Sequence, residues 1–372
     1  MRTAFKLTAL AGIAAAAVYT PLVLADAPLG TSPELLAPLG VIQTGKPSVM
    51  LVATKDHKPF YEAYNDASDL NGDGNLDTRF DPNITYIGLF DPKVCYTHAN
   101  GGTNAGLFSP DSVSTDTATY KCPGKWSGNW LNYVTTSRID ALRKVLYGGF
   151  REVDTAAETV LRRAYIPQDT HAWAKEYTST AIDGYDISDY TPLSQPSGSG
   201  TRRHFFGNIT LSAGTNCTTP DKCSVDLPPL MSVVQNSPRR VWDWVSKQAP
   251  VMGNHHDGTR RDDYAVRVKV CTGTFLANCQ QYGASSYKPV GLLHDFGENE
   301  AILFGLLSSS YKKNMSGEVL RKVVSSFRNE VNQTTGQFTV NATIVQHFNA
   351  LRVRDFTGQS DRKRLSWREI VR

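Results

Sequence analysis

Residues 126–149 read WSGNWLNYVTTSRIDALRKVLYGG and contain the first clearly amphipathic segment of the chain. Four apolar side chains and one threonine recur on one face at helical spacing, at positions 131, 135, 139, 142 and 146. Gly148-Gly149 follows the last of them, and glycine commonly ends a helix because it adopts the left-handed conformation without strain. The sequence therefore predicts one helix over residues 129–146.

Further segments on both sides of this helix show the periodicity of strands or helices. Four short apolar or alternating runs predict β-strands, at residues 48–54, 84–90, 264–270 and 301–307. Capping residues and apolar spacing predict four more helices, from Thr155 to before Pro167, from Ser237-Pro238 onward, over residues 318–331 and over residues 341–351. Because strands and helices alternate, the expected fold is α/β, a layered sheet with flanking helices and long loops, of which residues 97–125 are one and 183–225 another.

The N-terminus has the features of a secretory signal peptide. Arg2 and Lys6 precede an apolar run, and Ala25-Asp26-Ala27 resembles a signal cleavage site. We expect residues 1–25 to be removed and residues 26–46 to form a leader. After cleavage, no stretch long enough for a transmembrane helix is expected.

Composition narrows the possible functions. The chain has 372 residues, of which 40% are hydrophobic and 20% charged, as in globular proteins. The formal charge of +4 comes from the C-terminal residues 352–372, where seven Lys or Arg outnumber three acids. We therefore expect a basic tail over residues 353–372 and no nucleic-acid partner for the body of the protein.

Six cysteines in an exported chain favour disulfide bonds. Sequence alone allows fifteen pairings, and nearest-neighbour pairing gives Cys95–Cys122, Cys217–Cys223 and Cys271–Cys279. The alternative is a metal site, which is disfavoured because the chain has no C-x-x-C motif and its cysteine spacings do not suit zinc.

The segment Asp69-Leu-Asn-Gly-Asp-Gly-Asn-Leu-Asp77 resembles a calcium-binding loop. Side-chain oxygens at alternate positions suit this hard cation, and a glycine at loop position six permits the sharp turn. The predicted ligands occupy loop positions one, three, five, seven (through the backbone) and nine; they are Asp69, Asn71, Asp73, Asn75 and Asp77. Position twelve, usually glutamate, is Phe80, so Asp66 or Asp81 would have to complete the shell. The alternative is an ion-free loop built from Asx turns.

Catalytic signatures are weak in this sequence. It has no G-x-S-x-G, H-E-x-x-H or P-loop motif, and neither His57 nor His255-His256 has a recognisable nucleophile in context. Tryptophans such as Trp126, Trp130 and Trp173 can line a sugar-binding surface, but their patterned positions favour a core role. We therefore expect no enzymatic activity.

Several motifs together resemble the PilY/PilC family of type IV pilus biogenesis and tip-associated adhesin proteins. The similar segments are Trp126–Tyr133 running into Ser137–Gly149, Phe304–Leu306, Ser310–Gly317 with Val319–Lys322, and Ala63–Asp69 leading into the calcium-type loop. The resemblance covers residues 47–352, the N-terminal region of such proteins. It implies an exported factor for pilus assembly, adhesion and twitching motility, located in the periplasm, the outer membrane or at the pilus and cell surface.

The resemblance also implies partners and a fold. Partners would be pilus components such as minor pilins and a host or abiotic surface, and the fold would be a divergent von Willebrand A-like domain. Strand 48–54 runs into Lys55-Asp-His-Lys58 rather than the D-x-S-x-S of that domain, so its ion site is not expected here. Family members continue into a β-propeller where this sequence ends at Arg372. The competing hypothesis is a carbohydrate- or surface-binding adhesin that pilus assembly does not require.

Overall fold

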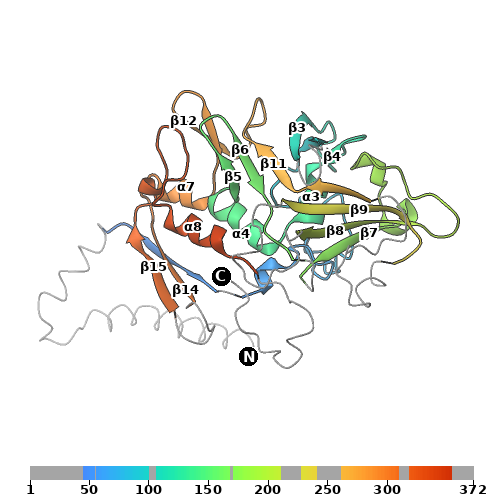
Figure 1. The fold of residues 1–372 in the computed structure, drawn as a ribbon, viewed down its shortest axis with the longest axis horizontal. Helices are drawn as coiled ribbons and strands as arrows, with labels where there is room; N and C mark the ends of the chain where they lie inside the picture. The colour runs from blue at the N-terminus through green and yellow to red at the C-terminus, as the bar shows by residue number, and fades with distance from the viewer. Residues whose placement is uncertain are drawn as a thin grey trace, which may run out of the picture. The chain divides into compact units, whose positions relative to one another are not determined.

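The computed structural model describes residues 45–54, 56–99, 106–167, 171–210, 228–240, 261–309 and 318–353. Within these ranges the chain has a mixed α/β fold, as predicted, with strands in four sheets and short helices (Figure 1). The buried apolar side chains form one aromatic core, a second core around three helices and a smaller third cluster.

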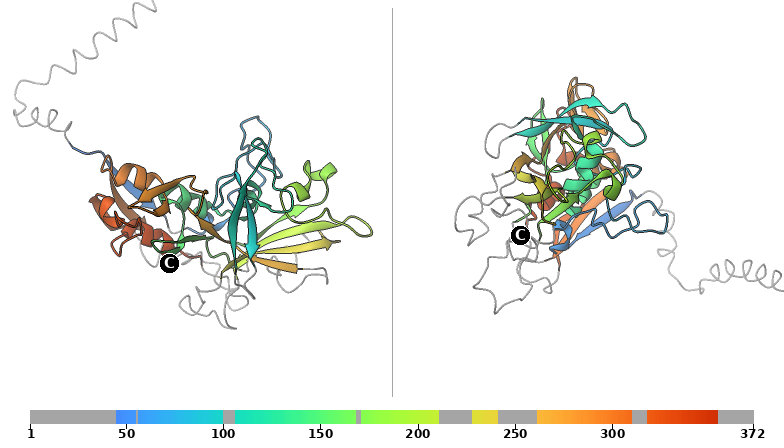
Figure 2. Two further views of the ribbon diagram at one scale, coloured as in Figure 1. Left: turned by 90° about the horizontal axis from the view of Figure 1, so that it is seen from above. Right: turned by 90° about the vertical axis from the view of Figure 1, so that its right-hand side faces the viewer.

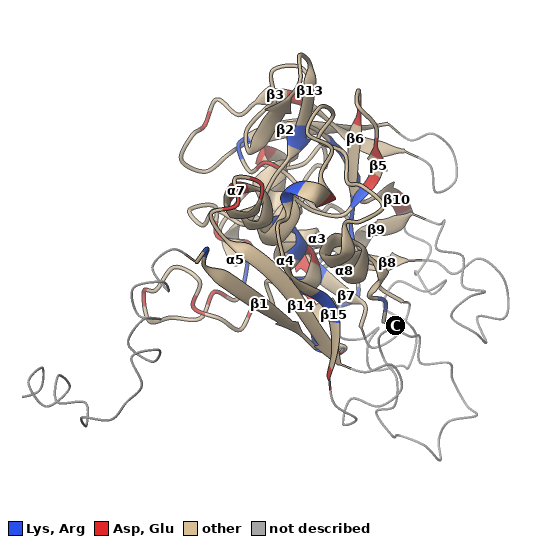
Figure 3. Cartoon of the chain, turned by 90° about the vertical axis from the view of Figure 1, so that its left-hand side faces the viewer, with Lys and Arg blue, Asp and Glu red and all other residues tan. Residues whose placement is uncertain are grey.

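The first sheet has three strands and joins distant parts of the chain. Its order is β1 (Ser48–Ala53), β14 (Leu303–Ser309) and β15 (Glu318–Ser325), and Figure 3 shows the three strands side by side. β1 and β14 are parallel, with Ser48 opposite Leu303, whereas β14 and β15 are antiparallel. The second core covers this sheet with side chains from α4 (Arg138–Tyr147), α7 (Leu292–Gly297) and α8 (Thr343–Ala350).

Two larger sheets enclose the aromatic core. The six-stranded sheet has the order β4 (Trp126–Ser127), β2 (Val94–Ala99), β3 (Leu107–Val113), β11 (Arg267–Val270), β6 (Thr159–Arg162) and β5 (Arg151–Asp154). The four-stranded sheet has the order β10 (Arg261–Ala265), β9 (Pro229–Ser237), β8 (Arg203–Thr210) and β7 (Trp173–Tyr177), visible in Figure 2. β12 (Cys279–Tyr282) and β13 (Ser286–Pro289) form a separate hairpin.

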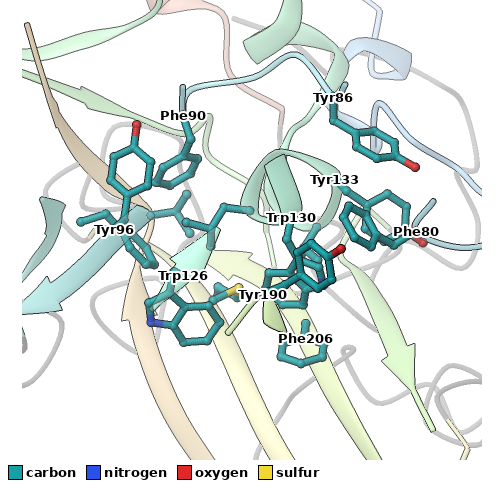
Figure 4. Packing of buried hydrophobic residues seen from close by; sticks show 14 of the residues in the cluster. Phe80, Tyr86, Phe90, Tyr96, Trp126, Trp130, Tyr133, Tyr190 and Phe206 are labelled. Carbon is teal, nitrogen blue, oxygen red and sulfur yellow. The ribbon is translucent and has the colours of Figure 1, made fainter. Parts of the chain in front are cut away.

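The helix predicted over residues 129–146 is instead two helices, α3 (Gly128–Thr135) and α4. Thr136 is extended, and the Ser137 side chain caps α4 by accepting the backbone N–H of Asp140. α3 is buried on every side and packs in the aromatic core, where Figure 4 shows Trp130 and Tyr133. α4 packs in the second core. The break therefore allows two adjacent helices to pack in different hydrophobic cores.

A buried carboxylate beside this break connects several elements. Asp140 accepts the N–H of Ala164 at 2.9 Å and lies 3.6 Å from the guanidinium of Arg143. Arg143 donates to the carbonyl of Phe348 at 2.6 Å, at the end of α8. Arg163 donates to the carbonyls of Ile209 and Leu230, on β8 and β9. Burial lowers the pKa of Arg163 to about 9, so this guanidinium stays charged at neutral pH.

The prediction of a strand at residues 84–90 is wrong. This segment has no strand partner, and two side chains of α3 bind its backbone instead. Asn129 accepts the N–H of Tyr86 and donates to the carbonyl of Ile84, both at 2.8 Å. Asn132 accepts the N–H of Phe90 at 3.0 Å and donates to two carbonyls at 2.9 Å. Side-chain amides thus satisfy backbone groups that a sheet would otherwise pair.

The helix predicted from Thr155 to before Pro167 is also wrong, because this region is the hairpin of β5 and β6. The Thr155 hydroxyl does accept the N–H of Glu158 at 3.1 Å, the bond expected of a helix cap. Here it closes the turn between two strands, together with a bond from the N–H of Thr155 to the carbonyl of Glu158. The same Ser/Thr hydrogen bond forms at helix N-termini and in turns between strands, so the pattern alone does not distinguish the two.

The helix predicted over residues 318–331 is β15 followed by the 3-10 turn η4 (Arg328–Glu330). β-branched residues are common in this segment and favour a strand when a partner is available. β14 supplies that partner, pairing Leu307 with Leu320. On one face Lys322 forms a buried ion pair with Glu330, while Val323 on the strand is 65% exposed.

Other predicted elements agree better with the structure. The strands at 48–54 and 301–307 are confirmed as β1 and β14, and the last helix as α8. The strand at 264–270 is divided between β10 and β11. The expected loops 97–125 and 183–225 contain the strands β3 and β8. The helix start expected at Ser237-Pro238 is wrong, because Ser237 ends β9 and residues 238–240 are not helical. The rest of that predicted helix lies outside the described residues.

We predict that replacing Asn132 with Ala lowers the free energy of unfolding by about 3 kcal/mol, because the substitution leaves buried backbone groups of Tyr86 and Phe90 unpaired. Urea denaturation of the purified chain measures the change. Asn329→Ala is the control, since that side chain is exposed, and its effect should stay within about 0.5 kcal/mol. Equal effects of the two substitutions would contradict the proposed role of Asn132.

Candidate functional site

The predicted calcium loop is a closed turn stabilised from inside by its first aspartate. The N–H of Asp77 donates to the carbonyl of Ser68 at 2.9 Å and closes the loop. The Asp69 carboxylate accepts the N–H groups of Gly72 at 2.7 Å and Gly74 at 2.9 Å. Both glycines have left-handed backbones, with φ of +79° and +89°, so a side chain at either position would strain the turn.

The remaining predicted ligands follow the same pattern of side chain to backbone bonds. Asn71 accepts the N–H of Asp73 at 2.9 Å, Asp73 accepts the N–H of Asn75 at 2.8 Å, and Asp77 accepts the N–H of Leu70 at 2.6 Å. An ion-binding loop and an ion-free Asx-turn loop share these bonds. In the described parts of the chain, no three His, Cys, Asp or Glu side chains gather in a metal-binding arrangement.

The loop is attached to strand β7 on its N-terminal side and to the aromatic core on its C-terminal side. Before it, Asp66 forms an ion pair with Lys175 of β7 at 2.6 Å and accepts the Tyr133 hydroxyl at 2.7 Å. Burial, followed by the nearby Asp66 charge, raises the pKa of Tyr133 well above its ordinary value, so the phenol remains a donor. After the loop, Phe80 is buried in the aromatic core, as Figure 4 shows.

Two cavities border the segment 78–80 that follows the loop. The first, which we call the acidic cavity, has a volume of about 620 Å³ and is lined by Asp77, Asp81, Asp183, Asp186 and Asp189 with Arg79 and Lys121. The second, the β7 cavity, has a volume of about 490 Å³ and lies along the edge strand β7. Its polar lining includes Asp66, Arg79, Lys175, Glu176 and Arg203.

No local sequence motif marks the residues of the β7 cavity as a site. Lys175 and Glu176 are 109 or more positions from Asp66, and no spacing rule connects them. A lysine between aromatic residues at alternate positions of a strand, Trp173-Ala-Lys-Glu-Tyr177, was the available signal. Its side chain is 7% exposed, and a lysine is rarely this buried unless it is paired.

Two of the three expected disulfides are present in the described residues. Cys95 and Cys122 are bonded with Cα atoms 5.5 Å apart, and Cys271 and Cys279 with Cα atoms 5.8 Å apart. Cys217 and Cys223 lie outside the described residues, so their pairing stays a prediction.

Among the described residues, the histidine considered as a catalytic candidate is His57. The His57 ring packs against Tyr61 and His171, with ring centres 5.4 Å and 5.5 Å away, and burial lowers its pKa. His255-His256 lies outside the described residues. None of the helices in the described ranges has both the length and the apolar composition needed to cross a membrane.

Comparison with known proteins gives two domain matches and two named relatives. Residues 77–225 match the small alpha/beta domain of PilY1 homologs, and residues 304–371 match the second domain of PilY1 homologs. This second match runs beyond residue 352, where the resemblance was expected to end. No solved structure matches the chain.

Both relatives come from Xylella fastidiosa (strain Temecula1 / ATCC 700964) and are named type IV pilus biogenesis factor PilY1 homolog. One is 46% identical over 334 residues, which cover 82% of this chain and 21% of the relative. The other is 28% identical over 236 residues, which cover 60% of this chain and 17% of the relative. The chain thus spans about a fifth of the length of these curated relatives.

We predict that the double substitution C95S/C122S destabilises the chain by about 3 kcal/mol, because the disulfide closes a long loop of the unfolded chain. The matched control C271S/C279S opens a shorter loop, with a sequence separation of 8 instead of 27, and should cost about 1 kcal/mol less. Denaturation midpoints of the three proteins test this order. A larger loss in the control would contradict it.

Proposed function

The chain belongs to the PilY1 homolog family, and on this premise we propose that it is an exported, non-enzymatic factor in type IV pilus biogenesis. The observation that carries the proposal is 46% identity over 82% of the chain to a relative named for that role. The two domain matches support it independently, because they cover separate parts of the chain.

The proposed role is structural. Two disulfides and a dense aromatic core are suited to a rigid body that holds a surface toward other pilus components, with minor pilins as the expected partners and nucleic acid not among them. A divergent von Willebrand A-like core, if part of this body, would be built around the parallel strands β1 and β14. Adhesion to a host or abiotic surface and a contribution to twitching motility belong to the same proposal.

The proposed location is outside the cytoplasm: the periplasm, the outer membrane or the pilus and cell surface. The signal-like residues 1–25 and the disulfides support this location, because disulfides persist in oxidising compartments. The signal-like segment and the disulfides are features of this chain itself, so their support for the location does not depend on the longer relatives.

We propose that loop 69–77 binds calcium through Asp69, Asn71, Asp73, the backbone carbonyl of Asn75, and Asp77. Support comes from the loop spacing and from the left-handed Gly74 at the turn. Of the two candidates for the last ligand, Asp66 is already paired with Lys175, whereas the Asp81 side chain accepts hydrogen bonds from the nearby Asn83. A bound cation would stabilise the closed turn and offset the repulsion between its carboxylates.

Calcium at a hundredfold excess over Kd should stabilise the folded chain by about 2.7 kcal/mol, since only the folded loop binds it. The Asp73→Ala substitution should abolish this shift in thermal unfolding. Asp295→Ala, an exposed acid on α7, is the matched control and should keep the shift. If the Asp73 variant keeps the shift while the control behaves as expected, the ion does not bind this loop.

Deleting the gene should remove surface pili, and the 372-residue product should restore them if this part of the family structure suffices. Sheared pili from the parent, the deletion strain and the complemented strain are compared by quantitative blotting. Unchanged pili in the deletion strain would contradict a required role in assembly. That result would favour the alternative, a carbohydrate- or surface-binding adhesin. The β7 cavity is the structural observation that supports this alternative.

A further inference from the structure

The β7 cavity has the size and composition of a site for a small polar ligand. Its volume of about 490 Å³ lies within the range of about 300–1,000 Å³ found for such sites. Its lining includes the buried aromatic residues Phe80, Trp130, Tyr133 and Phe206, whose packing in the core Figure 4 shows. Residues of β7 and the first residue of β8 also line it.

The cavity contains more hydrogen-bond donors than the protein uses. The Lys175 ammonium donates to Asp66 and to the carbonyl of Tyr64, which leaves one of its three N–H groups without an acceptor in the described chain. Arg203 contacts Glu176 through Nε at 3.0 Å, and its two terminal nitrogens have no hydrogen bond within the described residues. Arg79, exposed between the two cavities, has no ion-pair partner among the described residues.

Two of these donors, Lys175 and Arg203, are held in place before any ligand arrives. The Lys175 side chain is 7% exposed and lies over the Tyr133 ring, with the nitrogen 4.7 Å from the ring centre. The Arg203 side chain is 14% exposed. A ligand that accepts hydrogen bonds would therefore pair mostly buried donors at little cost in side-chain ordering.

The charges of the lining restrict the class of ligand. Four cationic side chains and three carboxylates line the cavity, so a single negative charge is favoured. A doubly charged phosphate would be repelled by Asp66, Glu176 and Asp183, which are acceptors suited to hydroxyl groups instead.

We propose that the β7 cavity binds an acidic saccharide, whose carboxylate contacts Arg203 and Arg79 and whose hydroxyls contact Lys175 and the cavity carboxylates. This inference goes beyond pilus biogenesis and needs no calcium, because the donors belong to side chains outside loop 69–77. It names a ligand class for the adhesin alternative.

The test is isothermal titration of the purified full chain with tri-galacturonic acid, in buffer containing a calcium chelator. The neutral methyl ester of the same trisaccharide is the ligand control. Arg203→Gln and Arg79→Gln should each weaken binding about tenfold through loss of a charge-assisted contact, equivalent to about 1.4 kcal/mol. Arg328→Gln, an exposed arginine that does not line the cavity, should leave affinity unchanged.

Saturable binding that is lost with the ester and is about tenfold weaker in both cavity variants supports the proposal. Equal binding of acid and ester, or equal affinity of the cavity variants and Arg328→Gln, overturns it. Binding of an acidic peptide through Arg203 without any binding of the saccharide also overturns it and assigns the cavity to a polypeptide. Circular dichroism of each variant confirms folding, and Arg79→Gln, at an exposed position, keeps the test valid if Arg203→Gln unfolds.

Discussion

The arrangement of α4 against α8 and the strands depends on the interactions of the buried Asp140 carboxylate with two buried arginines. Arg143 and Arg163 are 1% and 0% exposed, and such charges are costly to bury unless a counter-charge and hydrogen bonds accompany them. Asp140 supplies a negative charge 3.6 Å from Arg143, while backbone carbonyls of α8, β8 and β9 accept the Nη2 groups of the two arginines. The Nε and Nη1 atoms of Arg143 and the Nε atom of Arg163 have no hydrogen-bond partner among the described residues. Because each arginine needs both kinds of partner, the network specifies how α4 lies relative to elements far away in sequence.

This constraint explains why α3 and α4 are separate helices. The aromatic core requires α3 to be buried on all sides, whereas α4 must direct Asp140 and Arg143 toward α8 and the strands. A continuous helix would keep one direction through both segments and one apolar stripe. The extended Thr136 and the Ser137 cap change the direction between them.

Local patterns predicted strands that consist of a continuous apolar run, and failed where strand pairing overrides a helical spacing of apolar residues. The runs at 48–54 and 301–307 read as buried strands and are strands. Residues 318–331 have helical apolar spacing, yet pairing with β14 makes the first part of the segment a strand. The calcium-type loop could be predicted from the sequence because its residues are contiguous. The donors of the β7 cavity were missed, since Lys175 and Arg203 approach Asp66 and Arg79 only after folding.

The ion pair between Asp66 and Lys175 connects the segment before loop 69–77 to the β7 cavity. Asp66 precedes the loop by three residues, and Thr78 to Phe80 follow it directly, so residues that flank the loop on both sides line the cavity. A cation that orders residues 69–77 reduces the freedom of these flanking residues, because the Ser68–Asp77 bridge connects them. Order in the loop would thereby lower the entropy cost of binding a ligand beside β7. If both ligands bind, the effect of the saccharide on calcium affinity would have the same magnitude, since the two binding free energies would be linked.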